Sequence, residues 1–263
     1  MKSDFIMTIQ TEIHHITPPG GQKLAYCRSE GAALLPTVMF LGGFRSDMQG
    51  TKAQYLEGAC RARGQSFIRF DYSGHGQSGG DFEDGTISRW RDDAAFILNS
   101  LTKGPVILVG SSMGGWIALL LLRTYPDRVA GLVGLAAAPD FTKGLYEQEL
   151  TEAQRKILHR QGYIDLSNDY SDEPYRFTLE LIEDGAQNSI LGTDFSCTCP
   201  IRLIQGMKDN DVAWQTAHRI KNTLKGADTV VFLVEDGDHR LSRPADLALI
   251  DAQVRLLSGL EPS

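Results

Sequence analysis

The residue with the clearest chemical setting is Ser112, at the centre of the pentapeptide Gly110-Ser-Ser-Met-Gly114. A nucleophilic serine in a G-x-S-x-G motif needs a strand directly before it and a helix directly after it. The apolar run Val106 to Val109 and the apolar stretch after Gly115 supply these two flanks. We therefore predict that Ser112 is a nucleophile held in a sharp turn between a strand and a helix.

A second match to the same motif surrounds Ser78, in Gly76-Gln-Ser-Gly-Gly80. This match lies in a polar, glycine-rich segment and is followed by Gly-Gly-Asp, without the helical pattern that a nucleophile needs. Because the chain contains 27 glycines, the motif can arise by chance, and the flanking elements must decide. They favour Ser112 over Ser78.

Acyl transfer through a serine also needs two preorganised N–H groups for the oxyanion that forms on the substrate carbonyl. One donor is expected from the residue after the nucleophile, Met113, and the other from the loop after an early strand. The run Thr37 to Leu41 is such a strand, and two glycines and then Phe44 follow it. We predict the backbone N–H groups of Phe44 and Met113 as the oxyanion hole. The alternative is a plain Gly-Gly turn.

The general base must be chosen among six histidines. They are His14, His15, His75, His159, His218 and His239. A strand–serine–helix turn of this kind predicts the chain order serine, acid, histidine, with the acid and the histidine in loops after later strands. Among the six, only His239 follows the last expected strand, and we predict that it is the general base.

The acid that orients the base should lie in the loop after the strand Ile201 to Ile204. Two carboxylates occur there, Asp209 and Asp211. We predict that Asp209 is the partner of His239, and Asp211 is the alternative. Such an acid holds the imidazole in the required tautomer and stabilises the imidazolium that forms during the reaction.

The elements around these residues alternate between short apolar runs and helical patterns. This alternation predicts an α/β fold, with a mostly parallel central sheet covered by helices on both faces. The chain should open with a hairpin formed by residues 8–17 and 23–28. The strands that follow are expected at Thr37–Leu41, Ser66–Phe70, Val106–Val109, Val129–Ala136, Ile201–Ile204 and Thr229–Val234. Helices are expected at Lys52–Gly64, Ile87–Leu101, Ser112–Thr124, Trp214–Leu224 and Pro244–Leu257.

One long segment, residues 141–196, interrupts the alternation. It contains no convincing strand, but it carries helical patterns at Glu152–Gln161 and Pro174–Glu183. A connection of this length is usually an insertion, and in an open α/β sheet the ligand crevice lies at the carboxyl ends of the strands. We expect residues 1–140 and 197–263 to form the core, and residues 141–196 to form a small, mainly helical cap over Ser112. The alternative is an insertion beside the sheet that touches no ligand.

Charge and hydropathy exclude several kinds of partner. The 263 residues carry a net charge of -7 without a Lys/Arg block, so nucleic acid is not an expected partner. The apolar run Trp116 to Leu122 is too short to span a bilayer, and we expect no integral membrane association. The residues from Met1 to Gly20 lack the basic start and apolar run of a secretory signal.

The cysteine pattern bears on compartment and metal binding. Four scattered cysteines, Cys27, Cys60, Cys197 and Cys199, form no disulfide framework, which fits a reducing cytosol. The pair Cys197 and Cys199 has no second pair and no histidine nearby, so two ordinary thiols are favoured over a metal site. We expect neither a metal nor a cofactor.

Five motifs together resemble a known family. They are Gly43-Phe-Arg-Ser-Asp-Met-Gln-Gly-Thr-Lys-Ala53, Phe70-Asp-Tyr-Ser-Gly-His-Gly-Gln-Ser-Gly79, Gly110-Ser-Ser-Met-Gly-Gly-Trp116, Gly206-Met-Lys-Asp209 and Asp238-His-Arg240. Within the α/β-hydrolase superfamily, they resemble the mitochondrial palmitoyl-protein thioesterase family, which also hydrolyses mycophenolic acid acyl-glucuronide. The resemblance extends over roughly Thr37 to His239 and is thin in the expected cap.

The resemblance implies the α/β-hydrolase fold, ester or thioester hydrolysis without metal or cofactor, and a catalytic triad at Ser112, Asp209 and His239. No mitochondrial targeting segment is recognisable before the first expected strand, so we expect a bacterial-type, cytoplasmic relative.

The sequence thus predicts a serine hydrolase that cleaves a carboxylic ester or acyl thioester through an acyl-serine intermediate. The expected partner is a small-molecule or acylated substrate. Two alternatives stay open, because fold alone does not choose among chemistries. One is a carbon–carbon hydrolase or peroxidase that uses the same triad, and the other is a non-catalytic ligand-binding protein on the hydrolase fold.

Overall fold

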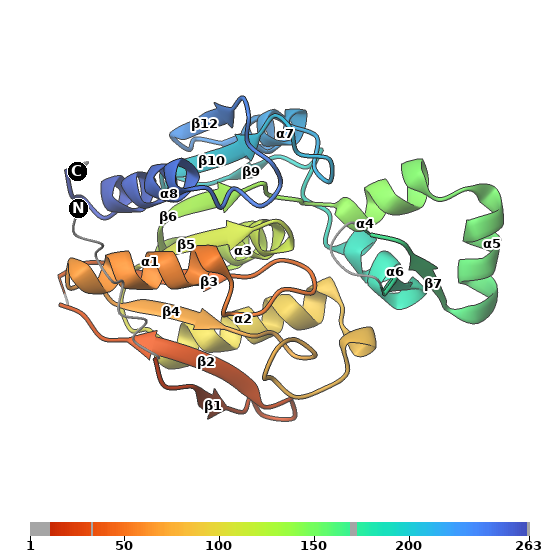
Figure 1. The fold of residues 1–263 in the computed structure, drawn as a ribbon, viewed down its shortest axis with the longest axis horizontal. Helices are drawn as coiled ribbons and strands as arrows, with labels where there is room; N and C mark the ends of the chain where they lie inside the picture. Colours follow the sequence, from red (N-terminus) through yellow and green to blue (C-terminus); the bar gives the residue numbers. More distant parts are fainter. Residues whose placement is uncertain (1–10, 33, 169–172, 262–263) are drawn as a thin grey trace, which may run out of the picture.

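The computed structural model describes residues 11–32, 34–168 and 173–261. In these ranges the main sheet has eight strands in the order β1-β2-β4-β3-β5-β6-β10-β12 (Figure 1). Its strands are β1 (His14–Ile16), β2 (Leu24–Ser29), β3 (Thr37–Leu41), β4 (Phe67–Phe70), β5 (Val106–Ser111), β6 (Val129–Leu135), β10 (Ile201–Gly206) and β12 (Thr229–Val234). The pairs β1–β2 and β2–β4 are antiparallel, and the other neighbours are parallel. Residues 8–10 of the expected opening strand lie outside the described ranges.

The register of the parallel strands brings their carboxyl ends to one edge. Leu41 of β3 pairs with Gly110 of β5, and Gly110 pairs with Gly134 of β6. On the far side of β6, Gly206 of β10 pairs with Val234 of β12. The loops that follow these strands therefore start from the same edge of the sheet, which is where the predicted site residues lie in the sequence.

Helices cover both faces of the sheet. Their bounds are α1 (Thr51–Ala62), α2 (Ile87–Leu101), α3 (Met113–Thr124), α7 (Gln215–Thr223) and α8 (Pro244–Leu257), with 3-10 turns η1 (Phe82–Asp84) and η2 (Pro126–Arg128). One hydrophobic core joins α1 and α8 to the sheet, and a second joins α2, α3 and α7 to the opposite face. Strand β5 contributes Ile107 and Val109 to the first and Leu108 to the second. Burial on both faces explains why β5 is an unbroken apolar run.

Residues 141–196 are here called the insertion, and its elements α4, α5, β7 and α6 lie beyond the carboxyl edge of the sheet (Figure 1). The insertion comprises α4 (Phe141–Gly144), the π-helical turn η3 (Leu145–Glu149), α5 (Glu152–Gln161), β7 (Tyr163–Leu166), β8 (Tyr175–Thr178), α6 (Leu179–Gln187) and β9 (Phe195–Ser196). It has a small core of its own, formed by Leu145, Leu150, Leu158, Ile164 and Ile182. Its last element, β9, pairs in parallel with β11 (Leu224–Lys225).

The expectation that the insertion contains no strand is wrong. Strands β7 and β8 form an antiparallel pair in which Ile164 lies opposite Phe177. The helix expected over Pro174–Glu183 begins only at Leu179, where the Thr178 hydroxyl accepts a hydrogen bond from the N–H of Leu181 at 3.1 Å. Aromatic and β-branched residues dominate the run before it, and they favour a pleated strand once a partner strand is present.

Both ends of the insertion are tied together by Asp140, which adopts a left-handed backbone with φ 60°. Its carboxylate accepts hydrogen bonds from the N–H groups of Ile190 at 2.8 Å and Leu191 at 2.9 Å, and from the Ser189 hydroxyl at 2.6 Å. The segment that leaves the sheet after β6 is thereby fixed to the segment that returns.

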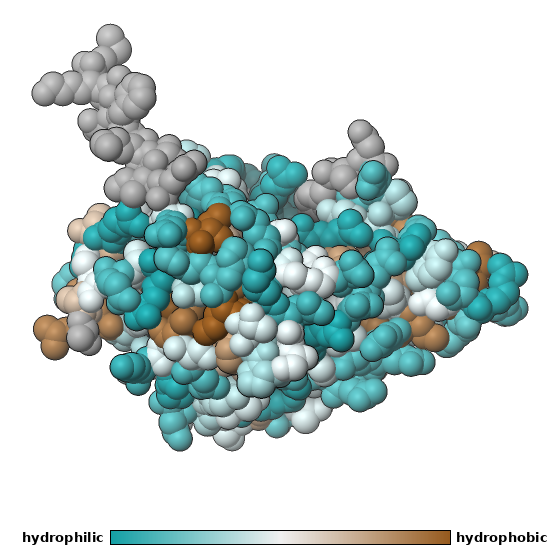
Figure 2. All heavy atoms as spheres, turned by 90° about the horizontal axis from the view of Figure 1, so that it is seen from below, coloured by the Kyte–Doolittle hydropathy of each residue, from teal (hydrophilic) through white to brown (hydrophobic). Residues whose placement is uncertain are grey.

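One face of the molecule is mostly polar. On the face shown in Figure 2, hydrophilic side chains predominate and hydrophobic ones form small, separate patches, as on an ordinary water-exposed surface. None of the described helices is long and apolar enough to cross a membrane.

Candidate active site

Ser112 occupies the turn between β5 and α3, with φ 54° and ψ -119°. This strained backbone is possible because glycines let the strand and the helix approach closely. A Cβ at Gly110 would lie 2.3 Å from the carbonyl oxygen of Gly114, and a Cβ at Gly114 would lie 2.2 Å from that of Leu41. The motif glycines are therefore required by packing, and they place the Ser112 hydroxyl at the carboxyl edge of the sheet.

Ser112, His239 and Asp209 form a continuous chain of hydrogen bonds. The Oγ of Ser112 lies 3.2 Å from Nε2 of His239, and Nδ1 of His239 lies 2.9 Å from Oδ2 of Asp209. A carboxylate only accepts, so Nδ1 carries the hydrogen and Nε2 is free to accept the serine proton. The three side chains come from the loops after β5, β12 and β10.

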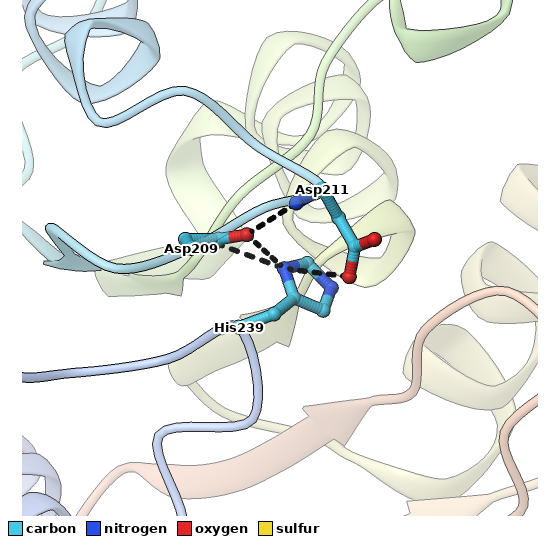
Figure 3. Close-up of side chains that lie close together, drawn as sticks. All are labelled: Asp209, Asp211 and His239. Carbon is cyan, nitrogen blue, oxygen red and sulfur yellow. Dashed lines mark hydrogen bonds and ion pairs between the residues drawn. The ribbon is translucent and has the colours of Figure 1, made fainter. Parts of the chain in front are cut away.

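Both candidate acids lie beside the imidazole of His239 (Figure 3), but they differ in distance from it and in exposure. The Asp209 side chain is fully buried, whereas that of Asp211 is 41% exposed and its Oδ2 lies 3.8 Å from Nδ1 of His239. Asp209 also accepts hydrogen bonds from the N–H groups of Asp211 at 2.9 Å and Val212 at 2.8 Å. Of the two carboxylates, Asp209 is therefore the one within hydrogen-bond reach of the imidazole.

The environment keeps the Asp209 carboxylate ionised. Burial by itself would raise the pKa of Asp209, but the hydrogen bond and charge of His239 and the two backbone donors outweigh burial and lower the pKa below its ordinary value. The side-chain amide of Gln205 adds a further donor, 2.8 Å from Oδ2. An ionised carboxylate at this position can stabilise positive charge that develops on the imidazole when it accepts a proton.

The loop that carries His239 is held by a residue that the sequence analysis missed. The Nζ of Lys52, in the first turn of α1, donates a hydrogen bond to the backbone carbonyl of Arg240. Burial lowers the pKa of Lys52 to about 8. Because 188 positions separate Lys52 from Arg240, no local pattern could have indicated this contact.

The predicted oxyanion donors lie beside the nucleophile. A Cβ at Gly43 would lie 3.3 Å from Cβ of Ser112, so the backbone just before Phe44 runs against the serine. Met113 is the first residue of α3, where N–H groups have no partner within the helix. In the described part of the chain, neither the N–H of Phe44 nor that of Met113 donates to a protein acceptor. Both N–H groups therefore lie beside Ser112 without a protein acceptor.

Ser78, at the centre of the second G-x-S-x-G motif, is engaged elsewhere. Its hydroxyl donates to the backbone carbonyl of Asp71 at 2.7 Å and accepts from the N–H of Ala25 at 2.8 Å. These bonds tie the loop after β4 to β2, and they give Ser78 a structural setting.

The other histidines have separate surroundings. His75 is buried against Tyr72, Phe82 and Trp90, and its Nδ1 lies 3.2 Å from the carbonyl of Ser73. Burial lowers the pKa of His75 to about 4. The remaining four lie on β1, α5 and α7, and they are His14, His15, His159 and His218.

A cavity of about 670 Å³ opens over Ser112 and His239. The core contributes the loop residues Gly43 to Ser46 and Val212. The insertion contributes five apolar and aromatic residues and three polar ones. They are Phe141, Leu145, Leu166, Tyr175 and Phe177, with Glu149, Ser167 and Asn168. Side chains of the insertion therefore line the same cavity as Ser112 and His239.

Metal-ligand groups converge at one place among the described residues. Asp209, Asp211 and His239 bring ligand atoms within 4.8 Å of one another. The hydrogen bond between His239 and Asp209 and the nearby Asp211 carboxylate account for the cluster. The four cysteines are free and buried, and burial raises the pKa of Cys199 to about 11.

Comparison with known proteins places the chain in a family. A profile of the alpha/beta hydrolase fold matches residues 42–163. The mitochondrial palmitoyl-protein thioesterase ABHD10 of Bos taurus is 36% identical over 244 residues, which are 92% of this chain and 78% of the relative. The Mus musculus protein of the same name is 38% identical over 244 residues, covering 91% and 81%.

Solved structures agree with the sequence relatives. A putative hydrolase from Agrobacterium vitis S4 superposes with a TM-score of 0.90 at 43% identity, covering 94% of this chain and 99% of that one. Alpha/beta hydrolase domain-containing protein 10 from mouse gives a TM-score of 0.86 at 34% identity, with coverages of 94% and 98%.

The parallel sheet, the strained serine turn and the matched profile define the class as the α/β hydrolases. Within that class the chain belongs to the family of the palmitoyl-protein thioesterase ABHD10, and it is an ester or thioester hydrolase. The predicted fold class and the family resemblance are both confirmed.

Proposed function

We propose that this enzyme is a serine hydrolase that cleaves a carboxylic ester or acyl thioester through an acyl-serine intermediate. Ser112 is the nucleophile, His239 the general base and Asp209 the orienting acid. The observation that carries the proposal is the unbroken hydrogen-bond chain from Ser112 Oγ through His239 to Asp209, at 3.2 and 2.9 Å.

Acylation follows from this arrangement. Nε2 of His239 takes the hydroxyl proton as Ser112 Oγ attacks the substrate carbonyl carbon. The N–H groups of Phe44 and Met113 stabilise the negative oxygen of the tetrahedral intermediate. When the intermediate collapses, the bond from carbon to the leaving oxygen or sulfur breaks, and Nε2 returns the proton to the leaving group.

Deacylation repeats these steps with water. Nε2 of His239 takes a proton from the water as its oxygen attacks the acyl carbon. The second tetrahedral intermediate releases the carboxylic acid, and the proton returns to Ser112 Oγ. Asp209 keeps Nδ1 protonated throughout, so that Nε2 is the nitrogen that exchanges protons.

The insertion, residues 141–196, acts in this proposal as a cap on a core formed by residues 1–140 and 197–263. Its apolar side chains Phe141, Leu145 and Leu166 line the cavity above Ser112, which suits an apolar acyl chain. The named relatives are palmitoyl-protein thioesterases, and we extend a fatty acyl group to this enzyme on the strength of that lining.

A panel of p-nitrophenyl esters and acyl thioesters of graded chain length tests the activity. Mass spectrometry of the enzyme during turnover should find the acyl group on the peptide that contains Ser112. A fluorophosphonate should label the same serine. An enzyme that binds these compounds without hydrolysis or labelling would instead be a ligand-binding protein.

We retain a cytoplasmic location as part of the proposal. The four free, buried cysteines support a reducing compartment. The relatives named above are mitochondrial proteins by name, so location must be measured for this chain itself. Fractionation of cells that express the full-length enzyme should recover it with cytosolic markers, and recovery with membranes or an organelle would contradict the assignment.

A further inference from the structure

The side chain of Phe44 is the centre of an aromatic cluster shared by the core and the cap. Five rings have centroids within 6.1 Å of it, and these belong to Phe82 and Trp90 of the core and Phe141, Tyr175 and Phe177 of the cap. Four of the contacts are edge-on. Phe177 alone is stacked parallel, at 5.2 Å with an interplanar angle of 5°.

The backbone of Phe44 has few other restraints. Its N–H belongs to the peptide group between Gly43 and Phe44, and the oxygen of that group accepts one hydrogen bond from Ser46 at 3.1 Å. Two consecutive glycines precede it, and glycine allows a wide range of torsion angles. A single hydrogen bond, at the oxygen, does not fix the orientation of the Gly43–Phe44 peptide plane. The packed ring of Phe44 is the second restraint on that plane.

Strand β8 of the cap contacts this loop through Tyr175 and Phe177, and it contacts the core turn η1 through Arg176. The guanidinium of Arg45 lies 5.1 Å from the ring centroid of Tyr175, and it lies 4.5 Å from that of Phe82 on the core side. Arg176 donates to Glu83 at 3.2 Å. With the Phe177–Phe44 stack, these contacts dock β8 on the loop that contains Phe44 and on the turn η1 beside it.

We propose that Phe177 is a positioning residue for the oxyanion hole: its ring fixes Phe44 and, through it, the direction of the Phe44 N–H. This inference rests on the proposed function, in which that N–H binds the oxyanion. Cap docking then supports the chemical step itself, including for substrates whose acyl group is too short to touch the cap. A cap that only selected acyl chains would leave such substrates unaffected.

The test is the kcat and KM of Phe177→Ala with p-nitrophenyl acetate. Misplacement of an oxyanion donor should lower kcat by about 10-fold or more with little change in KM. The Ki of a trifluoromethyl ketone, whose adduct with Ser112 carries an oxyanion, should rise in parallel. Phe177→Tyr keeps the ring and should restore kcat. If Phe177→Ala folds poorly, Phe177→Leu takes its place, because leucine keeps the apolar volume but lacks the ring. Its kcat should also be lowered.

Phe96→Ala is the matched control, since Phe96 on α2 is a partly buried phenylalanine that packs on the same main core as Phe177. It should lower stability and leave the acetate kcat unchanged. The inference is overturned if Phe177→Ala and Phe177→Leu keep kcat within about 2-fold of wild type while Ser112→Ala is inactive. Full activity of Ser112→Ala would instead overturn the proposed function.

Discussion

Nε2 of His239 lies 3.2 Å from Oγ of Ser112, although 127 positions separate the two residues in the chain. The distance results from the sheet order, which sets β5, β6, β10 and β12 side by side with their carboxyl ends at one edge. Each residue is carried by the loop directly after its strand. The sheet therefore sets the relative positions of these loops. Because a single substitution in a loop leaves the sheet in place, its effect can be attributed to the contacts that it removes.

Replacement of the nucleophile should abolish hydrolysis. Ser112→Ala should lower kcat by on the order of 10⁶, because the variant lacks the proposed nucleophile. Thermal unfolding should stay cooperative, since within the described ranges Ser112 Oγ hydrogen-bonds to His239 alone. Ser78→Ala is the control: it should keep activity but lose about 1–3 kcal/mol of unfolding free energy, because it leaves the N–H of Ala25 unpaired. Loss of activity in Ser78→Ala alone would reverse our choice of serine.

The two aspartates should differ sharply in kinetics. Asp209→Asn keeps the shape of the side chain but favours the wrong imidazole tautomer, and kcat should fall by about 10⁴. Asp211→Asn should change kcat by less than about 10-fold, because the exposed Asp211 carboxylate lies outside hydrogen-bond distance of His239. Steady-state kinetics on both variants decides the matter, and the opposite ranking would exchange their roles.

Acid should destabilise the fold through His75. Burial lowers the pKa of His75 from 6.5 to about 4, so the folded state resists a proton that the unfolded state accepts. Above pH 6.5 His75 is neutral in both states and does not weaken the fold. As pH falls toward 4, the unfolded state takes up the proton first, and the free energy of unfolding should fall by about 3 kcal/mol at most.

Urea unfolding between pH 4 and 8 measures this effect. The ring of His75→Phe cannot be protonated, so its free energy of unfolding should fall less steeply with acid than that of the wild type. His218→Phe, a change on α7 away from this cluster, should leave the slope unaltered. Parallel curves for the wild type and His75→Phe would contradict the assignment.

Removal of the carboxylate of Asp140 should loosen the base of the cap. Asp140→Ala leaves two N–H groups and one hydroxyl without their acceptor, and it places alanine in a left-handed backbone. The unfolding free energy should fall by about 2 kcal/mol or more. Hydrogen exchange should accelerate at Ile190 and Leu191, whereas Asp140→Asn, which tolerates this backbone, should be milder. Unchanged exchange at these two amides would show that Asp140 is not their anchor.

Cap side chains in the cavity should control acyl-chain preference. Leu166→Trp places bulk in the cavity, so kcat/KM for long-chain p-nitrophenyl esters should fall by about 10-fold relative to the acetate. Ile157→Trp, on the exposed side of α5, is the matched change without a cavity contact and should preserve the preference. Equal effects of Leu166→Trp on long and short esters would argue against the cap as the acyl pocket.

Local signals in the sequence determined much of the fold. An apolar run, two spaced glycines and a helical pattern were enough to predict the turn at Ser112, because strand, turn and helix are contiguous. Helices α2 and α8 have the predicted bounds, since Thr86 caps the first by accepting from the N–H of Arg89 and Pro244 opens the second.

Contacts between distant segments were decided only by the tertiary structure. Strand β8 forms because it pairs with β7, with Phe177 opposite Ile164. The helical pattern along residues 174–183 contains no information about such a partner strand. Asp209 and Asp211 are the same residue type two positions apart, and only the backbone turn between them buries one carboxylate and exposes the other. Lys52 meets Arg240, and Phe177 meets Phe44, because the sheet and the cap bring together residues whose spacing in the sequence carries no such information.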